Sequence, residues 1–304
     1  MKILRAWLRA SRLPSQTFIL FPILFGVSVA FSVGYQLNLV YLLAVLLFSI
    51  MIQLYIVYAN DYADYELDLL NDTYTPFSGG SRVLVYNHLK REQIGLGAVV
   101  SGFLCLLLGF ILTLSGRPYA LILVFFSLTL LWLYSFKPVE LSYRGGGEFL
   151  QMVGAGFILP LFGYYVISGD IQSFPFQYYL SLLPLNLGCA ISTTLPDEPS
   201  DRRGGKRTLA VLAGRTKVQI AVITLHCVAV IFFVVVVKEL ILNLWIVAVI
   251  ILPLISIIVM IVCMKKSRPG NKTMFAFVLF SILSTLSFTI LITAAMLFGT
   301  HKSS

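Results

Sequence analysis

Asn60–Asp68 reads NDYADYELD and directly follows an apolar run, Leu39–Tyr58, that is long enough to cross a bilayer. On one continuous helix Asp61, Asp64 and Asp68 would project from the same face, because residues three, four and seven apart lie on one stripe. Carboxylates crowded in this way repel each other unless a cation lies among them. The stretch therefore predicts either a solvated acidic helix end or one half of a metal site.

A second acidic stretch, PDEPSD at positions 196–201, also follows a long apolar run. Its Asp197 and Asp201 are four residues apart and would again share one helix face. Two such clusters, each at the end of a membrane span, favour two halves of one metal site over two unrelated helix ends.

The composition predicts an all-α polytopic membrane protein. Of the 304 residues 59% are hydrophobic, whereas soluble domains contain about 45–50% apolar residues. Apolar runs recur along the whole chain and predict about nine transmembrane helices in a bundle, which we interpret as a single domain over residues 1–304. The expected spans are 14–33, 39–59, 92–114, 118–136, 147–167, 175–196, 216–237, 241–264 and 273–298.

The basic residues predict the orientation of these spans. With the N-terminus in the cytoplasm, all of the 22 Lys and Arg residues except Arg117, Lys238 and Lys302 fall in cytoplasmic segments, which agrees with the positive-inside rule. Both acidic clusters then face the cytoplasm, and an odd number of spans places the C-terminus on the opposite side. Anionic lipid headgroups attract such basic loops, so the net charge of +9 does not require a nucleic-acid partner.

Two loops share a sequence pattern. Gly79–Leu84 follows the first acidic cluster and reads GGSRVL, and Gly204–Leu209 follows the second and reads GGKRTL. Each loop precedes the next expected span, and the two loops are separated by four expected helices. We interpret this order as two pseudo-repeated halves.

The clusters favour a particular chemistry. Mg²⁺ prefers one or two carboxylates together with substrate phosphates and water, and nearby Arg82, Lys206 and Arg207 could bind phosphate oxygens directly. A diphosphate at the membrane surface with a long apolar tail inside a helical bundle is an isoprenyl diphosphate. Mg²⁺ and basic groups would stabilise the leaving diphosphate, and aromatic faces would hold the allylic cation.

A secondary transporter is the alternative from another class, because duplicated helical halves are also typical of transporters. Transporter sites lie near the bilayer midplane, however, and no expected span carries an Asp, Glu, Lys or Arg residue at its centre. The position of the carboxylates at one interface favours capture of an amphiphile at the membrane surface.

Both acidic motifs resemble those of the UbiA superfamily of intramembrane prenyltransferases. The resemblance rests on Asn60-Asp61-x-x-Asp64-x-x-x-Asp68 and on Asp197-x-x-x-Asp201, and it extends to Arg12-Leu13-Pro14, Tyr134-Ser135, Lys137-Pro138 and Gly205–Ala210. It implies a helical bundle around a central cavity, dependence on Mg²⁺ and transfer of a prenyl chain to an acceptor.

Within that superfamily the chain resembles the dihydroxynaphthoate prenyltransferases of menaquinone synthesis, on Tyr143–Glu148 (YRGGGE) and Gly163-Tyr164-Tyr165. Val57 and Thr194 depart from that branch, which has asparagines at these positions, and so does the insert Asn71–Ser81. The acceptor therefore remains open between 1,4-dihydroxy-2-naphthoate, 4-hydroxybenzoate and a non-aromatic lipid precursor.

The resemblance and the residue chemistry together give a set of candidate site residues. The metal-binding and catalytic candidates are Asp61, Asp64, Asp68, Asp197 and Asp201. The candidates for contact with the substrate are Asn60, Arg82, Tyr134, Lys137, Lys206 and Arg207. Tyr134 and Lys137 could equally serve as anchors at the membrane interface.

Overall fold

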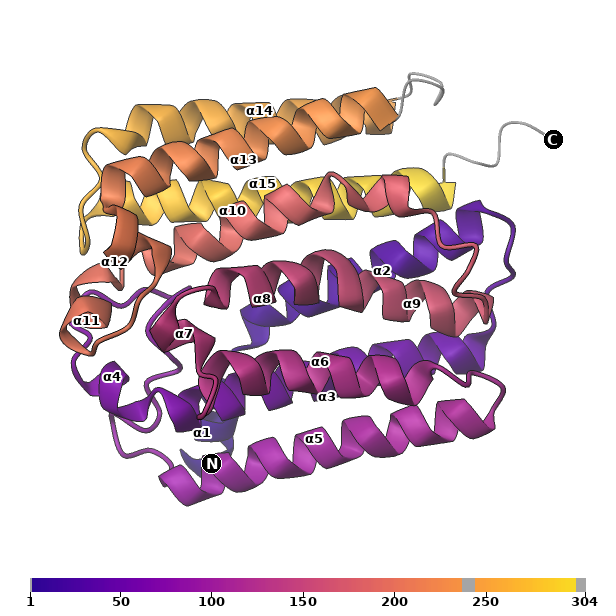
Figure 1. The fold of residues 1–304 in the computed structure, drawn as a ribbon, viewed down its shortest axis with the longest axis horizontal. Coiled ribbons are helices and arrows are strands. Elements are labelled where there is room, and N and C mark those ends of the chain that lie inside the picture. The colour runs from indigo at the N-terminus through magenta and orange to yellow at the C-terminus, as the bar shows by residue number, and fades with distance from the viewer. Residues whose placement is uncertain (1, 237–243, 299–304) are drawn as a thin grey trace.

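The computed structural model describes residues 2–236 and 244–298, which fold as helices joined by turns and loops (Figure 1). The helices are α1 (Lys2–Ala10), α2 (Thr17–Ser32), α3 (Leu39–Ala63), α4 (Tyr65–Leu69), α5 (Arg91–Leu114), α6 (Ala120–Ser135), α7 (Leu141–Arg144), α8 (Gly147–Val153), α9 (Leu159–Ser168), α10 (Leu182–Thr194), α11 (Glu198–Arg203), α12 (Leu209–Ala213), α13 (Arg215–Val236), α14 (Leu244–Met264) and α15 (Lys272–Phe298). This agrees with the all-α class expected from the sequence.

Seven helical segments are long and apolar enough to cross a membrane, among the residues that the structure describes. The expected count of nine is not confirmed, because two of the nine regions form shorter helices. Helix α6 has 16 residues and α10 has 13, whereas a full crossing takes about 20. The first turn of the expected span 175–196 is instead a separate 3₁₀ turn, Phe176–Tyr179, which follows Pro175.

The long helices run side by side as a bundle. Helix α2 packs against α9 and α15, α3 packs against α5, and α10 packs against α13. Helix α2 approaches α9 closely: a Cβ on Gly26 would lie 1.9 Å from the carbonyl oxygen of Pro160, and one on Gly163 would lie 2.2 Å from that of Ile23. Because only glycine permits such contact between backbones, these two helices form a close-packed wall.

The continuous acidic helix expected from the sequence is interrupted. Helix α3 ends at Ala63, Asp64 has φ −87° and ψ 7°, and α4 begins at Tyr65. The expectation that Asp61, Asp64 and Asp68 share one face of a single helix is therefore wrong in detail. Both Asp61 and Asp64 are buried and paired with partners from other segments, and these contacts stabilise the bend.

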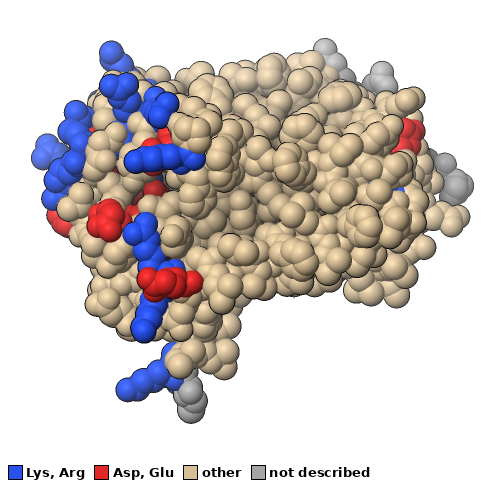
Figure 2. Space-filling model, turned by 60° about the horizontal axis from the view of Figure 1, so that its bottom comes forward, with Lys and Arg blue, Asp and Glu red and all other residues tan. Residues whose placement is uncertain are grey.

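The charged side chains gather at one end of the molecule. Figure 1 places the short helices α4, α7, α11 and α12 at that end, and Figure 2 shows most of the visible Lys, Arg, Asp and Glu residues there. Helix α15 ends at Phe298 at the opposite end. Which end faces the cytoplasm stays a prediction, and two of the basic residues on which it depends, Lys238 and Lys302, lie outside the described part of the chain.

Candidate active site

A cavity of about 610 Å³ runs into the bundle from the charged end. Four of the five predicted aspartates line it, Asp64 and Asp68 from the first cluster and Asp197 and Asp201 from the second. Further inside, the lining is mainly apolar, with Leu279, Ile282, Leu283 and Leu286 from α15 among its residues. The end that holds the aspartates is called the acidic end of the cavity below.

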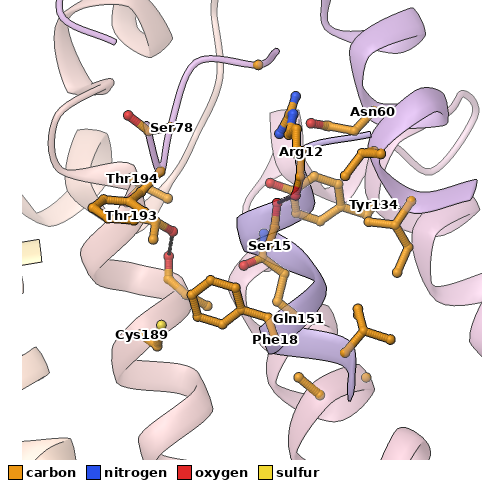
Figure 3. A pocket seen from close by; sticks show the side chains of 18 of the residues that line it. Arg12, Ser15, Phe18, Asn60, Ser78, Tyr134, Gln151, Cys189, Thr193 and Thr194 are labelled. Carbon is orange, nitrogen blue, oxygen red and sulfur yellow. Dashed lines mark hydrogen bonds between the residues drawn. The ribbon is translucent and has the colours of Figure 1, made fainter. Parts of the chain in front are cut away.

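Figure 3 shows how the two halves of the chain face each other across this cavity. Arg12, Asn60 and Tyr134 lie on one side, and Thr193 and Thr194 of α10 lie on the other. The two acidic clusters, which are more than 120 residues apart in the chain, are thus brought to one cavity, as the sequence predicts.

Asp61 is the predicted aspartate that does not line the cavity. It is 3% exposed and forms an ion pair with Arg12, whose backbone is left-handed with φ 44°. The hydroxyl of Ser81 also donates a hydrogen bond to Asp61. Asp61 therefore connects three segments, the N-terminal turn, the end of α3 and the loop after the first cluster.

Asp64 pairs with the second half of the chain. Its Oδ2 lies 2.8 Å from Nζ of Lys206, and both side chains are buried. Asn60 donates to the same oxygen at 2.9 Å. Burial lowers the pKa of Lys206, but the Asp64 carboxylate beside it holds that pKa well above its ordinary value, so Lys206 is a cation at neutral pH.

The second cluster is held by hydrogen bonds. Asp197 immediately precedes α11 and accepts a hydrogen bond from Nδ2 of Asn71 at 2.8 Å. Asp201, one helical turn later, lies 3.3 Å from the Thr208 hydroxyl, which donates to it. Burial raises the pKa of Asp197 to about 6 and that of Asp201 to about 7.

Negative charge at the acidic end exceeds the positive charge that pairs with it. Asp68 is buried and its pKa is raised to about 7, first by burial and then by the Asp64 and Asp61 carboxylates. Within the described residues, the ion pairs to the five aspartates come from Arg12 and Lys206. Buried carboxylates in such excess favour binding of a cation.

The loop between α4 and α5 joins the two clusters directly. Besides the bond from Asn71 to Asp197, the Thr73 hydroxyl donates to the Pro196 carbonyl at 2.6 Å. From the other side, Arg203 donates to the Leu70 carbonyl at 2.6 Å. The geometry of each cluster therefore depends on the other half of the chain.

Comparison with known proteins agrees with this site. Residues 19–283 match the model of the UbiA prenyltransferase family. The chain belongs to that family. The family is one of prenyltransferases, and membership together with the long apolar helices identifies an integral, multi-pass membrane protein.

One curated relative and two solved structures are informative. The chain is 24% identical over 196 residues, 64% of its length, to the 1,4-dihydroxy-2-naphthoate octaprenyltransferase of Bacillus subtilis, and the match spans 61% of that relative. The apo structure of a UbiA homologue from Aeropyrum pernix has a TM-score of 0.70 at 18% identity, covering 92% of this chain and 97% of that one. A UbiA homologue from Archaeoglobus fulgidus, bound to GPP and Mg²⁺, has a TM-score of 0.70 at 17% identity, and the match covers 96% of this chain and 99% of that one. These two structures show the fold.

The predicted substrate contacts of this UbiA-family chain fall into two groups. Asn60, Tyr134 and Lys206 line the cavity, whereas Arg82, Lys137 and Arg207 do not. The side chains of Lys137 and Arg207 are exposed at the charged end. Contact of these three with a substrate stays a prediction.

Arg82 has partners of its own. It is 8% exposed with φ 65° and donates from Nη1 to the carbonyl oxygen of Asp68. Its guanidinium also stacks over the ring of Tyr74, 4.5 Å from the centroid. Arg82 thereby holds the backbone of Asp68, whose side chain lines the cavity.

Sequence reasoning missed three residues at this site as functional candidates: Arg12, Asn71 and Glu148. Arg12 and Asn71 line the cavity. Glu148 is 2% exposed and accepts a hydrogen bond from the backbone N–H of Leu209 at 2.7 Å, three residues after Lys206. Arg12 and Glu148 stand in motifs that carry the family resemblance, but their partners are distant in sequence, so nothing local showed what they contact.

Proposed function

We propose that this UbiA-family enzyme transfers a prenyl chain from an isoprenyl diphosphate to an aromatic acceptor within the membrane, and that the acceptor is the quinone precursor 1,4-dihydroxy-2-naphthoate. One observation carries the proposal: both aspartate clusters meet at the acidic end of a cavity that is otherwise largely apolar. An amphiphile with a diphosphate head and a hydrocarbon tail is complementary to such a cavity.

Mg²⁺ is the cofactor in this proposal, and the donor set fits it. Among the described residues, no three His, Cys, Asp or Glu side chains converge as a ready-made metal site. Mg²⁺ usually takes one or two carboxylates and completes its shell with phosphate oxygens and water. The carboxylates of Asp64, Asp68, Asp197 and Asp201 would therefore hold it together with the diphosphate, where it would supply charge stabilisation for the leaving group.

The chain's own residues bind and orient the donor. Lys206 and Arg12 place two cations at the acidic end, where negative charge grows on the diphosphate as the bond to C1 of the prenyl chain breaks. The amide of Asn60 is fixed by its hydrogen bond to Asp64. The apolar lining deeper in the cavity excludes water from the allylic cation, so that the acceptor ring rather than water attacks C1.

The choice of acceptor rests on two supports. The B. subtilis relative is named for a naphthoate acceptor, and Tyr143–Glu148 resembles the corresponding segment of that branch. The chain spans about three-fifths of that relative, and Val57 and Thr194 depart from the branch pattern. A second acceptor, 4-hydroxybenzoate or a non-aromatic lipid precursor, is therefore tested beside it.

The test is a direct assay. The purified protein in lipid nanodiscs is incubated with geranylgeranyl diphosphate, Mg²⁺ and each acceptor in turn, and products are identified by mass spectrometry. We expect a prenylated naphthoquinol product that requires Mg²⁺. Prenylation of 4-hydroxybenzoate or a glycerol lipid in preference to naphthoate would contradict the acceptor assignment, and no transfer to any acceptor would contradict the enzyme assignment.

A further inference from the structure

The inner part of the cavity contains a side chain that binding of a prenyl diphosphate does not explain. Gln53 lines the cavity and is 3% exposed. It lies on α3 seven residues before Asn60, so it shares a face with Asn60 and sits roughly 10 Å deeper along the helix axis. Its Nε2 has no hydrogen-bond partner.

Two buried polar atoms without a partner belong to residues that line the cavity, in the described part of the chain: Nε of Arg12 and Nε2 of Gln53. The Arg12 atom lies at the acidic end, where the proposed function places a diphosphate. The Gln53 atom lies well inside, where the proposed function places hydrocarbon. Burial of an amide N–H without a hydrogen-bond partner destabilises the folded protein. A bound ligand that accepts a hydrogen bond from Gln53 would remove this cost.

Two other buried polar side chains that line this part of the cavity have partners within their own helices. Nδ2 of Asn186 donates to the Leu182 carbonyl at 2.9 Å, and the Ser127 hydroxyl donates to the Leu123 carbonyl at 2.9 Å. Both residues line the same cavity. Gln53 thus differs from Asn186 and Ser127 in having a buried amide nitrogen without a hydrogen-bond partner.

The chemistry of the two substrates identifies that ligand. A prenyl chain is a hydrocarbon and offers no hydrogen-bond acceptor, and the diphosphate oxygens are retained by the cations of the acidic end. The acceptor is then the substrate that can bring an oxygen atom to this depth. We infer that Gln53 forms the subsite for an oxygen-bearing substituent, a hydroxyl or carboxylate, of the aromatic acceptor. This inference rests on the proposed function.

The experiment compares Gln53→Met with a matched control, Gln219→Met. Gln219 on α13 is 1% exposed and its Nε2 also lacks a partner, but it does not line the cavity. Methionine keeps the length of the side chain and removes the amide. We expect Gln53→Met to raise the KM for the naphthoate acceptor about two- to tenfold, the range for one hydrogen bond, with the KM for the prenyl diphosphate unchanged. Gln219→Met should change neither.

Thermal stability without substrates separates binding from structure. Removing a buried amide that lacks a partner should leave the Tm of both variants unchanged or raise it. A residue with only a structural role would instead show a lower Tm together with changes for both substrates. An unchanged acceptor KM in Gln53→Met, or a rise confined to the prenyl diphosphate, would overturn the subsite.

Acceptor analogues identify the substituent. 1-Hydroxy-2-naphthoate lacks the second hydroxyl, and 1,4-dihydroxynaphthalene lacks the carboxylate. The wild-type enzyme should discriminate against the analogue that lacks the group bound by Gln53, and Gln53→Met should lose that discrimination. Discrimination that is equal in the two proteins for both analogues would contradict the inference.

The subsite can be judged even if the proposed function fails. Should the wild-type protein prenylate no acceptor, the proposed function is wrong, and thermal shifts induced by the naphthoate in the wild-type and Gln53→Met proteins decide the subsite. A shift that disappears in the variant would support it. An equal shift in both proteins, or none in the wild type, would overturn it.

Discussion

Nζ of Lys206 lies 2.8 Å from Oδ2 of Asp64, across a sequence separation of 142 residues. The corresponding position in the first glycine-rich loop, Ser81, donates its hydroxyl to Asp61. Thus the residue after each Gly-Gly pair reaches an aspartate of the first cluster, one through a hydroxyl and the other through a cation. The two similar loops therefore contact the first cluster through different chemical groups, a hydroxyl and an ammonium.

Replacing Lys206 by Met should impair both stability and donor binding. The change leaves the buried Asp64 carboxylate without its cation, which typically costs about 3–5 kcal/mol. Loss of a charge-assisted hydrogen bond to the diphosphate, about 1.5–3 kcal/mol, should raise the KM for the prenyl diphosphate by about one to two decades. Thermal unfolding and steady-state kinetics measure the two effects.

The double variant Asp64→Asn/Lys206→Met provides the control. It removes both charges, so its Tm should recover toward the wild-type value while activity stays low. Recovery of activity along with Tm would mean that the pair is needed only for folding.

Asp197→Ala should abolish prenyl transfer and leave membrane insertion intact, because Asp197 lies at the start of α11 and not in an apolar span. The same outcome is expected for Asp61→Ala, through loss of its contacts to Arg12 and Ser81. Glu198→Ala is the matched control, since Glu198 pairs with the exposed Arg202 outside the cavity. Normal turnover by purified Asp197→Ala protein in excess Mg²⁺ would contradict a site made from both clusters.

Lysine substitutions should separate the two loop arginines. In Arg82→Lys the charge remains, but the bond to the Asp68 carbonyl and the stacking on Tyr74 are weakened. We expect a lower Tm and a higher KM for the prenyl diphosphate. Arg207 is exposed, so Arg207→Lys should leave Tm unchanged and raise that KM several-fold by loss of the bidentate fork. If both variants had wild-type kinetics, the two arginines would serve only to orient the protein in the membrane and would not contact the diphosphate.

The affinity for Mg²⁺ should depend on pH. The pKa values of Asp68 and Asp201 are raised to about 7, and that of Asp197 to about 6, so protons compete with the metal near neutrality. Titration of Mg²⁺ followed by thermal shift should give weaker apparent affinity at about pH 6 than at about pH 8. A pH-independent affinity would mean that other groups bind the metal.

The same pKa values have a consequence for folding. Because these three carboxyl groups bind protons more tightly when folded than when unfolded, they favour the folded state at low pH, and their contribution is lost as pH rises from about 4 through about 7. Without Mg²⁺, Tm should fall over that interval, and saturating Mg²⁺ should reduce the fall.

Much of the fold and of the acidic end was predictable from local sequence. Long apolar runs identify membrane helices because the bilayer fixes their length, and seven of the described segments meet that criterion. The paired clusters predicted one site because both follow a span on the same side. The interruption at Asp64 was missed, because the ion pair to Lys206 that accompanies it joins residues far apart in sequence.

The interior of the cavity was not predictable in the same way. A glutamine within an apolar run, such as Gln53, gives no signal of whether its amide meets a carbonyl, another helix or a ligand. The partner of the amide depends on which helices α3 contacts, and the sequence contains no periodic pattern that specifies which helices pack together. The shortened α10 was missed for a related reason, since hydropathy does not detect that Phe176–Tyr179 forms a separate 3₁₀ turn before the helix.

The contact between Lys206 and Asp64 also bears on how the protein is made. Synthesis proceeds from the N-terminus, so Asp61, Asp64 and Asp68 leave the ribosome long before Lys206 and before Asn71 can meet Asp197. Until then Asp64 lacks the Lys206 cation that pairs with it in the folded protein. Assembly of the candidate site is therefore a late event in biogenesis, and a nascent chain that stops before position 206 carries the first aspartates without the cation that pairs with Asp64.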